Sequence, residues 1–282
     1  MNPPVHPPQA AVRRAVTVAL EEDLLPLGDI TAALLPAGVS GRGAFVSRGE
    51  GVIAGTACVV EACRQVDPRL VVEVLLDDGC AVAAGQQVVA LEGAMAAIVT
   101  AERTALNFLC HLSGIASLTA RYVEAAARRN PATRVLDTRK TTPGLRALEK
   151  AAVRAGGGVN HRGSLSEGVL VKDNHLGYAS IGEAVRRACQ LWPGRMVEVE
   201  CDREDQVLEA LEAGATMVLC DNMSPEELGR CVALARAQDA AAGPVLVEAS
   251  GGVSLENIGD FAAAGADLIS VGALTHSAPI LD

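Results

Sequence analysis

The sequence predicts an α/β protein in which an N-terminal α/β sandwich domain precedes an incomplete parallel α/β barrel of fewer than eight strands. Three observations predict this fold. Short β-like runs separated by glycine turns occupy residues 42–95, a long helical segment covers 97–129, and six apolar runs then alternate with helix-compatible segments. Continuous apolar strands that alternate with helices are typical of a parallel sheet covered by helices. We therefore expect a sandwich domain over residues 1–108 and a barrel over 109–275, with 276–282 able to pack back on the first domain.

Composition excludes several classes of protein. The 282 residues are 50% hydrophobic and 21% charged, which is typical of an ordered globular chain. A net charge of −10 and only six aromatic residues argue against binding to nucleic acid or to an anionic membrane. No apolar run approaches the roughly 20 residues that span a bilayer, and the N-terminus "MNPPVHPPQA" lacks the apolar core of a secretion signal. The eight cysteines form no CxxC pair, which indicates reduced thiols and no zinc site, so we expect a cytoplasmic protein.

The N-terminal region carries a helix, a capped turn and several short strands. Residues 9–24 have apolar positions at helical spacing, and the stretch "GDITAALLP" that follows indicates a turn capped by Asp29 or Thr31. A helix near "TACVVEACRQV" interrupts the β-runs. The region also slightly resembles a lipoyl or biotinyl carrier domain. Such carriers attach their cofactor to a lysine, and residues 1–139 contain none, so the carrier interpretation fails.

The helical segment 97–129 is expected to be interrupted near "SGI". After it come the six apolar runs "RVLDTRK", "GVLVKDNH", "MVEVECD", "TMVLCDN", "VLVEASGG" and "LISVGALTH". Segments between them, such as "REDQVLEALEAG", have helical periodicity and N-terminal acids. Six units are fewer than the eight of a complete barrel, and a doubly wound open sheet is the alternative. Against the open sheet, no GxGxxG follows the first strand, and polar residues follow all six runs.

The few lysines mark a cationic window. Of the 24 basic residues only Lys140, Lys150 and Lys172 are lysines, and all three fall between residues 139 and 172 together with four arginines. A merely solvated surface would mix the two signs of charge more evenly. Positions that stay lysine in an arginine-rich chain are candidates for chemistry that needs a compact ammonium group. The window therefore predicts an anion-binding site.

Polar residues gather at the carboxyl ends of the predicted strands, where α/β barrels carry their active sites. They are Arg139, Lys140, Lys172, Glu200, Asp221, Ser250 and His276, with His161 and Arg162 on the loop "GGGVNHRG". Arginine binds carboxylates and phosphates through two parallel hydrogen bonds, so the substrate should be polyanionic. Glycines in "SGG" and "GALT" would let backbone N–H groups approach a phosphate.

Two acids and two other histidines complete the candidates. Glu200 and Asp221 end neighbouring runs, so their carboxylates are expected to face each other. They could be structural ion pairs, but we favour a role in holding Mg²⁺ on a phosphorylated substrate or in stabilising a developing positive charge. His111 lies on a mostly apolar helix and is expected to be a packing residue, and His175 is expected to tie down a loop.

Several stretches from about Leu20 onward stand out together: they are "AERTALNFLCHLSGIAS", "DTRKTTPGLRALEKAAVRAGGGVNHR", "VLVKDNH", "VEVECD", "LCDN", "EASGGVSLENI" and "VGALTHS". In this order and at this spacing, they resemble the quinolinate phosphoribosyltransferase family. The resemblance implies phosphoribosyl transfer from 5-phosphoribosyl 1-pyrophosphate to quinolinate with decarboxylation. The products would be nicotinate mononucleotide, pyrophosphate and CO₂, as in de novo NAD biosynthesis, and the implied cofactor is Mg²⁺.

The resemblance also implies a role for each matching residue. Quinolinate would be bound by Arg139, His161 and Arg162, with Thr138 beside them, and phosphoribosyl pyrophosphate by Lys140 and Lys172. Glu200 and Asp221 would serve the metal and the ribose, and with the two lysines they would be the catalytic residues. The 5-phosphate would be held by Ser250, Gly251, Gly252 and Gly272, with His276 nearby. Arg103, in the "ERT" motif, would reach into the site of a partner subunit, which implies a homodimer with shared active sites.

Three rival functions remain open at this point. A paralogue found with molybdate transport genes shares the "DTRK" and "HR" blocks but usually lacks the lysine of "KDNH", so Lys172 disfavours it. A Schiff-base aldolase would use a strand-end lysine, and Lys172 is placed for that role. A phosphosugar-binding sensor would share the pocket without catalysing a reaction.

Overall fold

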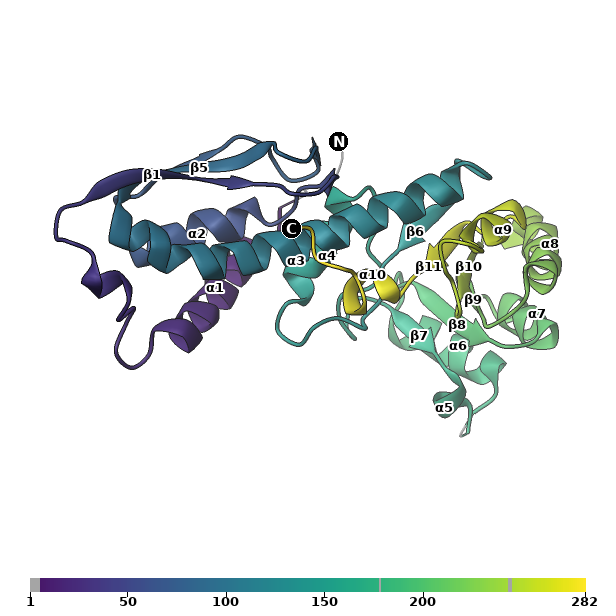
Figure 1. Cartoon of the computed structure of the whole chain (residues 1–282). Coiled ribbons are helices and arrows are strands. Elements are labelled where there is room, and N and C mark those ends of the chain that lie inside the picture. The colour runs from purple at the N-terminus through teal and green to yellow at the C-terminus, as the bar shows by residue number, and fades with distance from the viewer. Residues whose placement is uncertain (1–5, 178, 243–244) are drawn as a thin grey trace. The chain divides into compact units, whose positions relative to one another are not determined.

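The computed structural model describes residues 6–177, 179–242 and 245–282, apart from the side chains of 176 and 239–242 (Figure 1). The chain divides into two compact units. Unit 1 holds Met1–Ala120, Lys140–Gly158 and Ala273–Asp282, and unit 2 holds Arg121–Arg139 and Val159–Gly272. The domain boundary that the sequence suggests after residue 108 stays a prediction, and a continuous helix passes through it.

Unit 1 begins with a helix, α1 (Gln9–Leu24), that buries three residues spaced four apart, as an amphipathic helix should. A short 3₁₀ helix, η1 (Ala32–Leu34), follows it. The Asp29 carboxylate accepts hydrogen bonds from the N–H groups of Thr31 and Ala32 at 3.0 and 2.8 Å. The capped turn is therefore confirmed, with Asp29 as the capping residue. The next helix, α2 (Thr56–Val66), also buries one face, and it lies where the sequence predicts it.

An antiparallel sheet of strand order β1–β5–β3 forms the other layer of unit 1. Its strands are β1 (Ser40–Val46), β5 (Gln87–Ala94) and β3 (Val71–Val74), and a separate pair is formed by β2 (Gly51–Val52) and β4 (Ala81–Val82). Figure 1 shows α1, α2 and the long helix α3 on one side of this sheet. Phe45, Val89 and Leu91 are buried on that side, while Arg42 and Glu92, at alternate positions, are exposed.

A single helix, α3 (Met95–Ala127), runs for 33 residues without a break. The interruption predicted near "SGI" is therefore wrong. A β-carbon on Gly114 would lie 2.1 Å from the carbonyl oxygen of Pro279, so glycine is needed there for close approach. The Ser113 hydroxyl accepts from the N–H of Ala54 at 3.0 Å and donates to its carbonyl at 3.1 Å. These small residues are contact points on a continuous helix.

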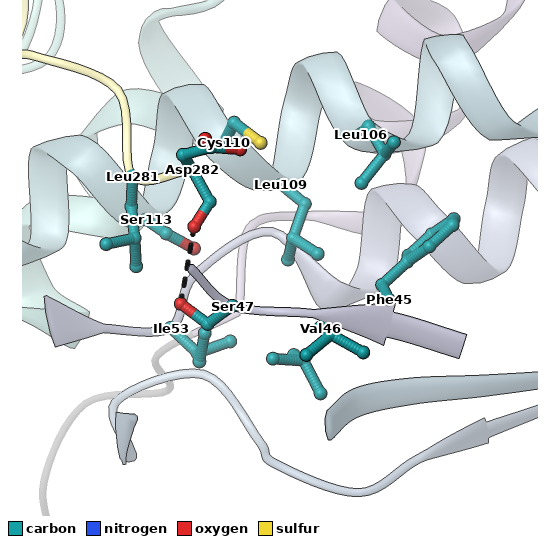
Figure 2. Close-up of a pocket in the computed structure, with 11 residues that line it drawn as sticks. Phe45, Val46, Ser47, Ile53, Leu106, Leu109, Cys110, Ser113, Leu281 and Asp282 are labelled. Carbon is teal, nitrogen blue, oxygen red and sulfur yellow. Dashed lines mark hydrogen bonds between the residues drawn. The ribbon is translucent and has the colours of Figure 1, made fainter. Parts of the chain in front are cut away.

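The last residues of unit 1 pack against β1 and α3. The Leu281 N–H donates to the carbonyl of Cys110 at 3.0 Å, and the Arg48 N–H donates to the carbonyl of Asp282 at 2.7 Å. Between these residues lies an apolar cavity of about 30 Å³, lined among others by Phe45 and Leu109 (Figure 2). A space of this size holds about one or two water molecules at most, so it is a packing gap rather than a ligand site.

Unit 2 is built on a parallel sheet of six strands in the order β6–β11–β10–β9–β8–β7. The strands are β6 (Arg134–Leu136), β7 (Val169–Val171), β8 (Val197–Cys201), β9 (Met217–Asp221), β10 (Leu246–Ser250) and β11 (Leu268–Ser270). All six predicted runs are therefore confirmed as strands. Among the described residues no ladder joins β6 to β7, so the barrel is incomplete, as predicted.

Helices cover the outer face of this sheet (Figure 1). They are α6 (Ile181–Leu191), α7 (Glu204–Glu212), α8 (Pro225–Ala242) and α9 (Ile258–Ala263). The four-residue helix α5 (Asp173–Leu176) follows β7 directly, while α4 (Arg146–Ala155) and α10 (Ala273–His276) belong to unit 1. The start of α6 is fixed by a capping box, in which the Ser180 hydroxyl accepts from the Glu183 N–H and the Glu183 carboxylate accepts from the Ser180 N–H. Within the described part of the chain, no helix is long and apolar enough to cross a membrane.

Candidate active site

The carboxyl ends of β8, β9 and β10 carry three polar side chains on neighbouring strands. Residues inside these strands are mostly buried, whereas Glu200, Asp221 and Ser250 are half-buried. Parallel pairing puts Ser250 beside Asp221, and it puts Glu200 beside Leu219, two residues before Asp221. The two acids thus end paired strands, as the sequence predicts. They can reach a ligand at this edge of the sheet of unit 2.

Lys172 follows β7 and makes an ion pair with Glu200 on the neighbouring strand β8. Its backbone N–H donates to Nδ1 of His175 at 3.0 Å, so this histidine fixes the turn into α5 and ties down the loop, as predicted. The Lys172 side chain is 39% exposed, and that of Glu200 is 18% exposed. The ammonium is therefore held in one place while a ligand can still reach it. An ion-paired ammonium is a poor nucleophile, which counts against the aldolase alternative.

Asn222 and Gly251 shape the turns that follow β9 and β10. The Asn222 amide donates to Oδ2 of Asp221 at 2.7 Å, and its backbone is left-handed, with φ 56°. Gly251 and Gly252 are also left-handed, at φ 86° and 61°. A β-carbon on Gly251 would lie 2.2 Å from Oδ1 of Asn222. The two turns therefore pack so closely that only glycine fits at 251, which leaves backbone groups within reach of an anion.

Arg162 lies on the loop that follows α4, and its neighbours hold it in place. The Arg162 guanidinium donates to the carbonyl of Gly168 at 2.9 Å. Burial lowers the pKa of Arg162, repulsion from Arg139 lowers it further, and attraction to Glu198 opposes both effects. Two guanidinium groups are thus close enough to repel each other in unit 2. Such a pair is suited to a ligand with two negative charges.

His161 precedes Arg162, and its ring is 8% exposed. Nδ1 accepts a hydrogen bond from the Arg162 N–H at 2.8 Å, and Nε2 lies 3.1 Å from Glu198 Oε2 and 3.5 Å from Glu248 Oε2. The backbone is fixed as well, because Asp137 accepts from the His161 N–H at 2.9 Å and from the Asn160 amide at 2.6 Å. Both ring nitrogens of His161 therefore face groups of this chain.

Sequence reasoning missed Glu198 and Glu248, which lie in the middle of β8 and β10 and have no exposed surface. Burial, followed by repulsion from Glu198, raises the pKa of Glu248 to about 8. With His161 they form the one cluster of three possible metal-ligating side chains found in the described residues. The missed signal is an acid inside an otherwise apolar strand, "VEVEC" and "LVEAS".

Comparison with known proteins identifies the family. The profile of the quinolinate phosphoribosyl transferase C-terminal domain matches residues 115–282, and that of the N-terminal domain matches 29–113. The chain belongs to the quinolinate phosphoribosyl transferase family. It is 42% identical to nicotinate-nucleotide pyrophosphorylase [carboxylating] of Mycobacterium leprae, over 96% of this chain and 95% of that protein. It is 39% identical to a probable enzyme of the same name from Bacillus subtilis, over 90% and 86% of the two chains.

Solved structures of the family have the same fold. The nicotinate-nucleotide pyrophosphorylase of Francisella tularensis superposes with a TM-score of 0.90 at 37% identity, and the match covers 98% of this chain and 95% of that chain. The high coverage includes both units of the chain. The incomplete barrel and the sandwich-like sheet are therefore the family fold.

Three residues that the family resemblance implicates lie in unit 1. Arg103 is exposed on α3, and Lys140 is exposed, with its carbonyl accepting from the Thr275 hydroxyl at 2.8 Å. His276, on α10, has Nδ1 2.6 Å from the Ser277 hydroxyl. His111 has a partner that the sequence did not reveal, since its Nε2 lies 2.9 Å from Oε1 of the buried Glu149. It is a satisfied histidine, as predicted.

Glu200 and Asp221 fit a magnesium ion by their chemistry. Both offer carboxylate oxygens at paired strand ends, and both are half-buried rather than sealed. Mg²⁺ is usually held by one or two carboxylates together with substrate phosphates and waters, and not by a complete protein cage. The residues at these strand ends therefore suit a magnesium ion bound together with a phosphorylated ligand.

Proposed function

We propose that this protein transfers the phosphoribosyl group of 5-phosphoribosyl 1-pyrophosphate to the ring nitrogen of quinolinate. Loss of the 2-carboxylate as CO₂ then gives nicotinate mononucleotide, and pyrophosphate leaves. This makes it a carboxylating nicotinate-nucleotide pyrophosphorylase, an enzyme of NAD biosynthesis. The observation that carries the proposal is that unit 2 holds both the mutually repelling guanidinium groups of Arg139 and Arg162 and the Lys172–Glu200 ion pair, in a chain of this family.

The guanidinium groups suit the dicarboxylate. Arg139 and Arg162 repel each other, and two carboxylates on adjacent ring carbons would relieve that repulsion. Nicotinate, with one carboxylate, would leave part of this charge without a partner. We therefore expect strong discrimination in favour of quinolinate. Thr138 lies beside Arg139 and is assigned to the same substrate.

Acids and lysines suit the transfer step. Departure of pyrophosphate leaves an oxocarbenium-like ribose, which the carboxylates of Glu200 and Asp221 can stabilise. Lys172, and Lys140 by the family resemblance, would neutralise charge on the leaving group. Once the ring nitrogen is ribosylated it is cationic, so it can stabilise the electron pair left on the adjacent ring carbon when the carboxylate leaves as CO₂, and a proton from water then completes the C–H bond of the product. The 5-phosphate is assigned to the turns at Ser250, Gly251, Gly252 and Gly272, with His276.

Magnesium would be held by Glu200 and Asp221, where it would neutralise charge on the pyrophosphate. The family resemblance further assigns Arg103 to the site of a partner subunit, so we expect a homodimer. We also expect a cytoplasmic enzyme. The dimer can be tested by mixing Arg103→Ala with Lys140→Ala protein. Restored activity after subunit exchange would support shared sites, and an exchanged but inactive mixture would reject them.

The direct test uses purified protein with quinolinate, phosphoribosyl pyrophosphate and Mg²⁺. Quinolinate should be consumed, and nicotinate mononucleotide and CO₂ formed, only when all three are present. Lys172→Ala serves as the matched control, because it removes the strand-end ammonium and leaves the core unchanged. Consumption without phosphoribosyl pyrophosphate, or equal kcat/KM for nicotinate, would reject the proposal. Binding of phosphosugar without turnover would favour the sensor alternative.

A further inference from the structure

Two carboxylates in unit 2 are buried without the hydrogen bonds that buried acids usually have. Glu198 and Glu248 have no exposed surface, and no described residue donates an aligned hydrogen bond to any of their four oxygens. Buried polar groups left in this state cost free energy and need an explanation. The ring N–H of His161 points between them, 3.1 and 3.5 Å from the nearer oxygens.

The other ring nitrogen decides the protonation state of His161. Nδ1 accepts the N–H of Arg162 at 2.8 Å, so it carries no proton. In a neutral imidazole the proton is then on Nε2, facing the two glutamates. A metal ion bound by His161, Glu198 and Glu248 would need the lone pair of Nε2, which this tautomer does not offer. The cluster is therefore not a metal site.

We propose that His161 is a positioning residue, held as a neutral imidazole above Glu198 and Glu248, and that it fixes the backbone N–H of Arg162 and so the approach of the Arg162 guanidinium to the substrate. This inference rests on the proposed function, because it concerns how the dicarboxylate pocket is held in shape. It gives His161 a role other than contact with quinolinate.

The contacts around His161 make the loop rigid from both sides. Asp137 fixes its backbone N–H and the preceding Asn160, while the Arg162 guanidinium is fixed at Gly168. The N–H of Arg162 lies between these points and donates to Nδ1 of the His161 ring. Without this acceptor a half-buried N–H loses its partner, and the backbone can rotate to find water. A rotation there would move the guanidinium that follows.

Glu198 has a second effect on the same pair. Its charge offsets the burial of Arg162 and the repulsion from Arg139. Because burial raises the pKa of Glu248 to about 8, that carboxyl carries a proton at neutral pH, and the pair holds close to one negative charge instead of two.

Two variants of His161 separate positioning from direct substrate contact. The Oδ1 of asparagine takes nearly the place of Nδ1, so His161→Asn keeps an acceptor for the Arg162 N–H. His161→Gln places its amide near Nε2 and loses that acceptor. Calorimetry with quinolinate should therefore give a Kd about tenfold weaker for His161→Gln than for His161→Asn, the usual effect of one buried hydrogen bond. Melting curves of both variants check that each is folded.

Equal quinolinate Kd values for the two folded variants, or weaker quinolinate binding by His161→Asn, would overturn the inference. Direct contact through a charged ring would be lost equally in both variants. Failure of the wild type to bind quinolinate would instead reject the proposed function. The KM for phosphoribosyl pyrophosphate should change less than twofold in either variant, because the loop of His161 and Arg162 is assigned to the other substrate. A parallel loss for both substrates would indicate a general structural defect and reject the positioning role.

Nitrogen-15 NMR of the ligand-free wild type tests the tautomer without any substrate. The His161 signals are assigned by their absence in His161→Asn. We expect a protonated Nε2 and an unprotonated Nδ1 at neutral pH. A protonated Nδ1, whether in the other tautomer or in an imidazolium, could not accept the Arg162 N–H and would overturn the inference.

Two variants of Glu198 test whether this residue acts through His161. Glu198→Gln keeps a polar oxygen in the position that faces Nε2 of His161, whereas Glu198→Leu removes it. The quinolinate Kd of the glutamine variant should therefore lie several-fold closer to the wild type than that of the leucine variant. If the two variants have the same Kd, Glu198 does not act through His161.

Discussion

Two fully buried glutamates, one in each unit, have opposite surroundings. In unit 1, Glu149 has both oxygens engaged, since Oε1 lies 2.9 Å from Nε2 of His111 and Oε2 accepts from the Thr142 N–H at 3.0 Å. In unit 2, Glu248 is equally buried, yet no described residue donates an aligned hydrogen bond to it. A buried acid with both oxygens hydrogen-bonded holds a loop in place, whereas one without aligned hydrogen bonds costs stability that a functional site can use. The hydrogen bonds of a buried acid therefore indicate its role better than its burial does.

The largest expected effect is a loss of activity when the strand-end lysine of unit 2 is removed. Lys172→Ala should lower kcat/KM by about 100- to 1,000-fold, the range seen when one charge-stabilising donor is removed from a site. The melting temperature should change little, because the Lys172–Glu200 ion pair is partly exposed and such pairs contribute at most about 1 kcal/mol. Steady-state kinetics and thermal melting check the two statements. A kcat/KM close to that of the wild type would show that Lys172 is not part of the active site.

Removal of the buried glutamate of unit 1 is expected to destabilise the fold. Glu149→Ala should lower the free energy of unfolding by about 3 kcal/mol, because His111 and the Thr142 N–H both lose a buried partner. Glu149→Gln should cost less, since its amide oxygen can still accept from Thr142. Urea unfolding of both variants gives the difference. If Glu149→Ala proved as stable as the wild type, the contrast between the two glutamates would fail.

Two neighbouring glycines in unit 2, Gly251 and Gly252, allow the cost of backbone strain to be measured separately from the cost of side-chain crowding. A side chain on Gly251 needs the left-handed φ of 86° and would place its β-carbon 2.9 Å from the backbone nitrogen of Asn222. Gly252 is also left-handed, but no atom lies within 4 Å of such a β-carbon. Gly251→Ala should therefore cost about 1–3 kcal/mol, and Gly252→Ala should cost clearly less. Equal costs in thermal unfolding would show that crowding by Asn222 adds nothing.

A further effect is a change in the pH dependence of stability. The pKa of Glu248 rises from its usual value of 4.5 to about 8, first by burial and then by repulsion from Glu198, with a smaller contribution from Asp137 against the lowering effects of His161 and the Ser270 hydroxyl. Between these two pH values the folded protein binds more protons than the unfolded chain, so stability falls as the pH rises.

Glu248→Gln removes this titration because its amide stays neutral. Relative to the wild type, the variant should therefore gain stability from pH 5 to pH 8. Denaturant unfolding at the two pH values measures the change. A wild-type-minus-variant difference that is the same at both pH values would contradict the raised pKa.

The sequence alone predicts most of this fold. Each of the six apolar runs in the second half became a strand, because a continuous apolar run of that length can be buried on both faces. The break expected in the long helix did not occur, because Ser113 and Gly114 meet segments distant in sequence, Ala54 and Pro279. Local propensity cannot reveal such contacts.

The strand-end residues were also predictable, but the acids beneath them were not recognised. Glu198 and Glu200 are two residues apart on β8, so their side chains leave the same face of the strand. Because Glu200 lies near the carboxyl end of β8, Glu198 lies on the same face but further inside the sheet. Its partner Glu248 comes from β10, and the strand β9 lies between β8 and β10. That juxtaposition depends on strand order, which the sequence does not state.

The distribution of thiols has a practical consequence for measuring this protein in solution. Of the eight cysteines only Cys80 and Cys189 are exposed, and the first belongs to unit 1 and the second to unit 2. Burial raises the pKa of the Cys58 and Cys201 thiols to about 12, which keeps them protonated and unreactive. A maleimide dye added to the unmodified chain should therefore label these two positions first. Energy transfer between a donor and an acceptor placed there would report the distance between the units, and any change in it when substrates bind, without a single substitution.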